Sequence, residues 1–152
     1  MIIRSMQTAD LPEVQRIEQE SMIDPWSEMQ LLAEMDAVNG VAFVAEEGSQ
    51  VCGYAFFRTC APESELLRLA VARDWRRQGI GGTLLDHASR FFSEEGYETC
   101  FLEVRCSNEE ARHFYMKADF QQVGIRKKYY CQPVEDALQL CRNLKDSRGG
   151  NP

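Results

Sequence analysis

Residues 76–82, RRQGIGG, place two arginines and a glutamine directly before three glycines, with only Ile80 among the glycines. The preceding stretch, LLRLAVARDW at 66–75, has the composition of a strand, and TLLDHASRFF at 83–92 has the apolar spacing of a helix. Where a glycine-rich turn enters a helix N-terminus, free backbone N–H groups and the helix dipole favour an anion. The loop therefore predicts a phosphate-binding site.

Two familiar phosphate-binding loops do not fit this spacing. Leu84 stands where the third glycine of a dinucleotide-binding G-x-G-x-x-G loop would lie, and the loop lacks the Lys-Ser/Thr ending of a P-loop. Arg76 and Arg77 add positive charge that suits a phosphate group. A tight turn with two solvated arginines is the alternative interpretation.

The bulk composition indicates a globular protein of one domain. The chain has 152 residues, 44% of them hydrophobic and 27% charged, which is ordinary for a domain with a substantial core. We expect one domain over residues 1–144 and a frayed, polar, glycine-rich tail at 145–152. Apolar runs are far shorter than a membrane span and no signal peptide is evident, so we expect a cytoplasmic protein.

The charge balance limits the expected partners. Twenty-four acidic and 17 basic residues give a formal net charge of −7, which argues against nucleic acid and anionic membranes as partners. A cationic partner suits this surface, although carboxylates that only keep the surface soluble are the simpler explanation.

The cysteines favour neither a metal site nor a disulfide framework. None of the six forms a C-x-x-C pair, and His87 and His113 are the only histidines. We expect no bound metal and predict buried free thiols in a reducing compartment.

Hydrophobic periodicity and turn residues predict the order β-α-α-β-β-β-α-β-α-β-β, an α/β (α+β) domain with a mixed sheet. Thr8 is expected to cap the first helix, Ser27 and Gln30 to form a capping box on the second, and Gly96 to end the third. The predicted strands are 2–6, 41–47, 50–60, 65–73, 99–105, 120–130 and 135–144, and the predicted helices are 8–22, 27–35, 80–95 and 108–117.

Several motifs together resemble one acetyltransferase family. R-x-x-G-x-G at 76–81, following LRLAV, resembles the acetyl-CoA pyrophosphate loop of the GNAT N-acetyltransferases. DPWSE at 24–28, FLEVRCSNEEARHFY at 101–115 and RKKYY at 126–130 followed by EDALQL resemble a narrower group, the RimI-type acetyltransferases of a ribosomal-protein N-terminal alanine. The resemblance implies the GNAT fold: a mixed, mostly antiparallel sheet of six to seven strands flanked by about four helices.

The resemblance also implies two residues that carry protons. An α-amino group has a pKa of about 8, so the acceptor must lose a proton before it attacks a thioester. Glu103 matches the family's proton acceptor, although a glutamate in a strand is often solvent-facing or paired with a neighbour such as Arg105. Tyr115 matches the group that protonates the departing thiolate, although a tyrosine on an apolar helix face is often a core residue.

The implied cofactor is acetyl-CoA, used as a co-substrate without a metal. Asn108 is expected to cap its helix or to contact the cofactor as well, and the backbone of the strand before the loop is expected to bind the acyl oxygen and pantetheine arm. The full set of expected cofactor-binding residues is Leu69, Ala70, Val71, Arg76, Arg77, Gln78, Gly79, Ile80, Gly81, Gly82 and Asn108.

The acceptor side is expected to involve Trp26, Tyr129 and Tyr130, each of which is equally compatible with a packing role. The expected partner is a basic protein N-terminus, that of a ribosomal protein. Asp119 stands where the family commonly has a glycine, and Cys131 stands where a proline is expected. A GNAT enzyme acting on a small amine or a lysine, and a non-catalytic acyl-CoA sensor, are the alternatives.

Overall fold

The computed structural model describes residues 1–145 and divides them into two compact units. Residues 1–60 with 66–88 form the first unit, and residues 61–65 with those from 89 onward form the second. The described part of the chain contains seven strands and four α-helices. The predicted fold class, a mixed and mostly antiparallel sheet of six to seven strands with about four helices, is confirmed.

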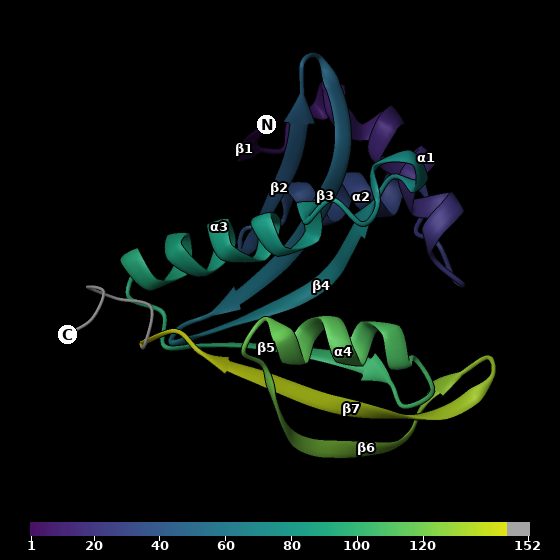
Figure 1. The fold of residues 1–152 in the computed structure, drawn as a ribbon, viewed down its shortest axis with the longest axis vertical. Coiled ribbons are helices and arrows are strands. Elements are labelled where there is room, and N and C mark those ends of the chain that lie inside the picture. The colour runs from purple at the N-terminus through teal and green to yellow at the C-terminus, as the bar shows by residue number, and fades with distance from the viewer. Residues whose placement is uncertain (146–152) are drawn as a thin grey trace. The chain divides into compact units, whose positions relative to one another are not determined.

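The first unit is built on an antiparallel meander (Figure 1). Glu47 faces Gln50 across a tight turn in which Gly48 has a φ of +64°, so the predicted hairpin is confirmed. Its strands are hydrogen-bonded in the order β1 (Ile2–Ser5), β2 (Gly40–Glu47), β3 (Gln50–Cys60) and β4 (Glu63–Val71).

Two helices, α1 (Leu11–Ser21) and α2 (Glu28–Asp36), belong to the same unit. The capping box of Ser27 and Gln30 is present as predicted. The prediction that Thr8 caps the first helix is wrong. Residues 8–10 form a short 3-10 turn instead, and the Asp10 carboxylate accepts the backbone N–H of Gln7 at 2.7 Å.

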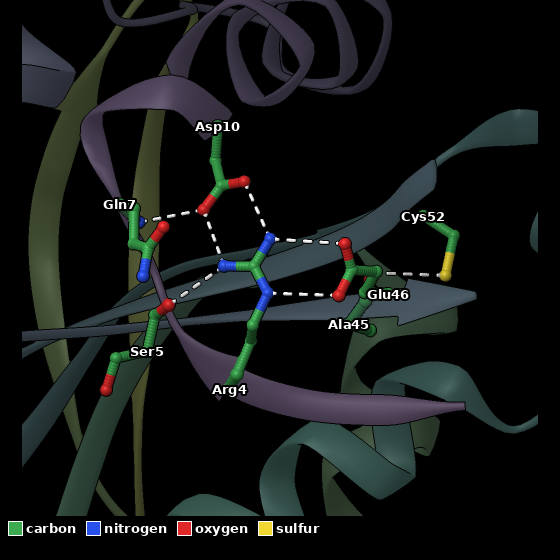
Figure 2. Close-up of polar contacts among 7 residues, drawn as sticks. All are labelled: Arg4, Ser5, Gln7, Asp10, Ala45, Glu46 and Cys52. Atoms are coloured by element: carbon green, nitrogen blue, oxygen red, sulfur yellow. Dashed lines mark hydrogen bonds and ion pairs between the residues drawn. The ribbon is translucent and has the colours of Figure 1, made fainter. Parts of the chain in front are cut away.

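The same Asp10 takes part in an ion-pair cluster that joins the start of the chain to β2. Figure 2 shows the Arg4 guanidinium between Asp10 and Glu46, with both Asp10 oxygens at 2.8 Å and Nε 3.1 Å from Glu46. The two parallel hydrogen bonds from Arg4 hold the pKa of Asp10 below its ordinary value. This cluster fixes β1 on β2 at the edge of the meander.

The second unit contains a sheet in which β7 lies between β5 and β6 (Figure 1). The β5–β7 and β6–β7 pairs are antiparallel, and the first residues of β4, Glu63–Glu65, pair in parallel with Thr99–Phe101 of β5. The helix α4 lies over one face of this sheet. The bounds are β5 (Thr99–Arg105), α4 (Glu109–Lys117), β6 (Gln121–Cys131) and β7 (Val134–Asn143).

Helix ends follow the predicted capping chemistry. The third helix, α3 (Ile80–Glu94), is followed by Gly96 with a φ of +93°, and the N–H of Tyr97 donates to the Phe92 carbonyl at 2.9 Å, as in a Schellman motif. Asp119 has a φ of +72° after α4, so it adopts the left-handed conformation of the glycine that it replaces.

The cysteine prediction is partly wrong. All six cysteines are free thiols as predicted, but only Cys52 and Cys100 are buried, while Cys60 and Cys131 are exposed. The two exposed cysteines end β3 and β6, where side chains leave the packed faces.

The prediction of one domain over residues 1–144 stays a prediction. The predicted tail at 145–152 lies outside the described residues except for Lys145. Within residues 1–145, no helix has the length and apolar character needed to cross a membrane.

Candidate functional site

The glycine-rich loop of the first unit has the backbone conformation of an anion site. Arg77 and Gly79 have φ values of +64° and +80°, and α3 begins at Ile80. The N–H and hydroxyl of Thr83 both contact the Gly79 carbonyl at 3.0 Å, which fixes the first turn. The first N–H groups of a helix have no acceptor within it, so they remain available to an anion.

Gly79 is required by its backbone conformation rather than by lack of space. A Cβ atom added there would meet no heavy atom within 4 Å, but a φ of +80° is strained for any residue with a side chain. Gly79 is exposed, as are Arg77 and Gln78, whereas Ile80 and Gly81 are buried and Gly82 is half-buried.

Arg76 makes contacts that the sequence does not reveal. Its Nε donates to the Val71 carbonyl and its terminal NH₂ to the Ser21 hydroxyl, both at 2.9 Å. The guanidinium therefore joins the end of β4 to the end of α1. Of the predicted β4 residues, Ala70 is buried, while Leu69 and Val71 are half-buried.

Trp26, which the sequence analysis assigned to the acceptor side, belongs to the first unit and lies in an irregular segment between α1 and α2. Its ring packs edge-on against Phe56 with centroids 5.8 Å apart and lies 4.2 Å below the Arg68 guanidinium. Its backbone N–H donates to the Glu18 carboxylate at 2.9 Å. Sequence patterns gave no role to Glu18 or Arg68, although Glu18 falls four residues after Val14 on the apolar stripe of α1.

In the second unit, Glu103 lies on β5 opposite Gln139 of β7. Its side chain is 13% exposed, and its carboxylate forms an ion pair with Arg126 of β6. The alternative pairing with Arg105 does not occur, because Arg105 lies 3.3 Å from Glu135 instead. Arg126 is a residue that sequence reasoning missed.

Tyr129 and Tyr130 lie beside this carboxylate. Their ring centroids are 5.1 Å apart, with Arg126 over Tyr129 and Arg105 over Tyr130 at 5.7 and 4.2 Å. Burial and the charge of the nearby Glu103 carboxylate raise the pKa of Tyr129. Burial, followed by the charge of Glu103, raises the pKa of Tyr130 to about 12.

Tyr115 on α4 has the protonation state of a proton donor. Burial of its phenol, with smaller contributions from Cys100 and Tyr130, raises its pKa above the ordinary value for tyrosine. The ring packs edge-on against Phe114 and Phe120, with centroids 5.0 and 5.7 Å away. The phenol therefore stays protonated well above neutral pH.

Asn108 caps α4 as predicted, because its side-chain oxygen accepts the N–H of Ala111 at 3.1 Å. In the second unit, Tyr129 and Tyr130 lie close enough to Glu103 for its charge to raise their pKa values, and Tyr130 contributes to the raised pKa of Tyr115. The glycine-rich loop, the end of β4 and Trp26 belong to the first unit. Among residues 1–145, no group of three or more His, Cys, Asp or Glu side chains is arranged to hold a metal ion.

Comparison with known proteins points to acetyl transfer. The model of the Acetyltransferase (GNAT) family matches residues 11–120. A ribosomal protein bS18-alanine N-acetyltransferase of Escherichia coli (strain K12) is 34% identical over 137 residues, which cover 90% of each chain. One from Haemophilus influenzae is 33% identical over 132 residues, covering 87% of this chain and 89% of that relative.

A solved structure of an enzyme with the same name also resembles this chain in its fold. The crystal structure of the ribosomal-protein-S18-alanine N-acetyltransferase from Escherichia coli superimposes with a TM-score of 0.87 at 29% identity. The superposition covers 99% of this chain and 98% of that one.

Proposed function

Because the chain belongs to the GNAT family and is an acetyl-transferring enzyme, we propose that it moves the acetyl group of acetyl-CoA to the N-terminal alanine of a small-subunit ribosomal protein. The observation that carries this proposal is the 34% identity, over 90% of the chain, to an enzyme named for that reaction. The net charge of −7 suits a cationic peptide as acceptor.

The glycine-rich loop is the proposed site for the cofactor pyrophosphate. Two left-handed residues, Arg77 and Gly79, precede the N-terminus of α3. Backbone N–H groups in this arrangement can surround an anion and benefit from the helix dipole. Acetyl-CoA, when bound, supplies the acetyl group as an activated thioester. Backbone N–H groups of residues 69–71 are proposed to orient its acyl oxygen.

Glu103 is the proposed proton acceptor. A carboxylate that is only 13% exposed has few competing water molecules, and the α-ammonium group of the acceptor must lose a proton to become nucleophilic. Glu103 accepts this proton on a carboxylate oxygen through one or more water molecules. Tyr129 and Tyr130 beside it are proposed to line the acceptor site.

Tyr115 is the proposed proton donor. The half-buried Tyr115 retains its proton at neutral pH because desolvation of its phenol raises its pKa. A group of this kind can deliver its Oη proton to a thiolate leaving group while Glu103, in the same unit, holds the proton of the amine.

The test is a comparison of kcat/KM for three acceptors. We expect fastest turnover of a peptide that begins with alanine and carries arginines soon after it. A small first side chain lets the amine approach to about 3–3.5 Å, the distance needed for attack. The same peptide with a blocked N-terminus and an added lysine, and spermidine, are the competing acceptors. Faster turnover of either would assign a lysine or small-amine acceptor, and no turnover with acetyl-CoA bound would indicate a non-catalytic sensor.

A further inference from the structure

A buried carboxylate in the first unit holds the segment that carries Trp26. The Glu18 side chain is 0% exposed, which is costly for a charged group unless its oxygens are bonded and its charge is paired. One oxygen accepts the Tyr54 hydroxyl, and the other accepts the backbone N–H of Trp26 at 2.9 Å. Burial and the Glu18 charge raise the pKa of Tyr54, so its hydroxyl remains a donor.

Arg68 of β4 supplies the opposing charge and makes two further contacts to the same segment. Its Nε lies 3.3 Å from Glu18 Oε2, an ion pair without the alignment of a hydrogen bond. Its terminal NH₂ donates to the Asp24 carbonyl at 3.0 Å, and its guanidinium lies over the Trp26 ring at 4.2 Å. The Arg68 side chain is 18% exposed, so its ion pair with the fully buried Glu18 is largely shielded from solvent, whereas its hydrogen bond to Asp24 lies at the surface.

The segment between α1 and α2 depends on these contacts because its backbone has little regular hydrogen bonding. Met22 to Trp26 form neither helix nor strand, and Ile23, Asp24 and Pro25 are exposed. Few packed contacts and little regular hydrogen bonding leave a segment free to change conformation unless side chains hold it. Glu18 accepts one N–H of this segment, and Arg68 donates to one carbonyl and stacks on the Trp26 ring. An apolar pair of similar size would fill the same space but would bond neither peptide group.

We infer that Glu18 and Arg68 are positioning residues that fix Trp26 in the orientation required to bind the acceptor. The inference rests on the proposed function, because it takes Trp26 to contact the acceptor peptide. Immobilising a free side chain on binding costs conformational entropy, and the irregular backbone adds to this cost. Loss of the pair is therefore expected to raise the acceptor KM while leaving the chemical step largely intact.

The experiment uses Trp26 as its own reporter. The chain has two tryptophans, so Trp75→Phe leaves Trp26 as the sole tryptophan, whose emission is excited selectively at wavelengths that tyrosine does not absorb. In that background Glu18→Gln, Arg68→Gln and Arg68→Lys are compared by Trp26 emission, acrylamide quenching, cofactor Kd and acceptor kinetics. Glu34→Gln is the matched control, because it removes the charge of a carboxylate in the same unit whose ion-pair partner is Arg58 rather than Arg68.

We expect Arg68→Gln and Glu18→Gln to shift Trp26 emission to longer wavelength and to increase its quenching. The acceptor KM should rise about tenfold, or about 1.4 kcal/mol, with kcat changed less than about threefold and the acetyl-CoA Kd unchanged. Arg68→Lys should raise the acceptor KM less than Arg68→Gln does. Lysine keeps the positive charge but lacks the planar guanidinium that stacks on Trp26 and can donate two hydrogen bonds side by side. Glu34→Gln should resemble the parent.

Three results would overturn the inference. Unchanged emission and KM in folded Arg68→Gln would make the pair purely structural, and a shifted emission with unchanged KM would remove Trp26 from the acceptor site. A rise in KM together with comparable falls in kcat and in acetyl-CoA affinity would indicate general damage to the fold. If Glu18→Gln fails to fold, Trp26 emission and the acceptor KM of the two Arg68 variants decide whether the inference holds. Failure of the parent to acetylate the alanine peptide would instead contradict the proposed acceptor, and KM would then be measured with the amine that it acetylates fastest.

Discussion

Arg126 on β6 reaches across β7 to form an ion pair with Glu103 on β5. Glu103 lies opposite Gln139 and Arg126 opposite Ala137, so the two side chains come from strands that do not pair with each other. Arg126 is half-exposed, whereas Glu103 is largely buried. The carboxylate of the proposed proton acceptor is therefore already paired with the long, partly exposed Arg126 side chain before any acceptor ammonium binds.

Glu103→Gln should lower kcat/KM by about 10²-fold or more, the usual effect of removing a general base. Glutamine keeps the shape of the side chain but cannot accept the ammonium proton. Steady-state kinetics with an alanine peptide, together with acetyl-CoA titration, provide the measurement. Glu109→Gln, which removes an exposed carboxylate in the first turn of α4, is the control. Equal activity in both variants would assign Glu103 a purely structural role.

Arg126→Gln should lower the acceptor KM by roughly threefold to fivefold. The guanidinium and an incoming ammonium compete for one carboxylate, and a like charge about 4 Å away costs about 1 kcal/mol even in water. Lys127→Gln removes a positive charge from the same strand without touching Glu103, since Lys127 pairs with Asp136. A higher KM in Arg126→Gln than in Lys127→Gln would contradict this competition.

Tyr115→Phe should reduce kcat by about 10²-fold while acetyl-CoA affinity and fold are retained. The phenylalanine keeps the ring contacts with Phe114 and Phe120 but has no proton to donate. Rapid-mixing kinetics at saturating cofactor measure the chemical step. Tyr97→Phe, the same change in a ring that packs on Phe92, should have little effect, and full activity of Tyr115→Phe would make this tyrosine a core residue.

Features that depend on neighbouring residues were predictable from the sequence. Gly48 at the hairpin, the Ser27–Gln30 box, Asn108 at the start of α4 and Gly96 after α3 all occur as expected. Their chemistry is complete within four or five residues, because caps and turns bond to adjacent backbone groups. The start of the first helix was not predicted correctly, because the Asp10 carboxylate bonds both Arg4 and the Gln7 N–H.

Side-chain partners from distant strands were not predictable in this way. Arg105 is close to Glu103 in sequence, but the register of β7 brings Glu135 to Arg105. Glu18 shares the spacing of the apolar residues Leu11 and Val14, which was a signal of burial. Its partners Tyr54 and Arg68 come from β3 and β4, and no local pattern identifies them.

The free energy of unfolding should fall above pH 10. Folding raises the pKa values of Tyr54, Tyr115 and Tyr130, the last to about 12, whereas an unfolded tyrosine titrates near 10. Above that value the unfolded chain binds fewer protons than the folded one, so stability falls with pH by at most about 1.4 kcal/mol per unit for each tyrosine. Below pH 10 these phenols are protonated in both states and contribute no slope.

Denaturant unfolding at pH 9 and pH 11 measures this loss, and tyrosinate absorbance of the folded protein reports the ionised fraction. Burial also raises the pKa values of the Cys52 and Cys141 thiols, which adds a loss of the same sign. Tyr130→Phe isolates the phenol contribution, because it leaves both thiols in place. A stability loss that is identical in the parent and in Tyr130→Phe would show that Tyr130 ionises alike in both states.

Gly79→Val should weaken acetyl-CoA binding at least tenfold, or about 1.4 kcal/mol. The left-handed backbone at Gly79 is strained for a β-branched residue, so the loop would abandon the conformation that presents its N–H groups. Gly48→Val is a matched control: its φ is +64°, a Cβ there also meets nothing within 4 Å, and it lies in the β2–β3 turn. Both variants should lose similar stability, but calorimetry should detect weaker cofactor binding only for Gly79→Val. Equal cofactor affinity in the two folded variants would remove the pyrophosphate from this loop.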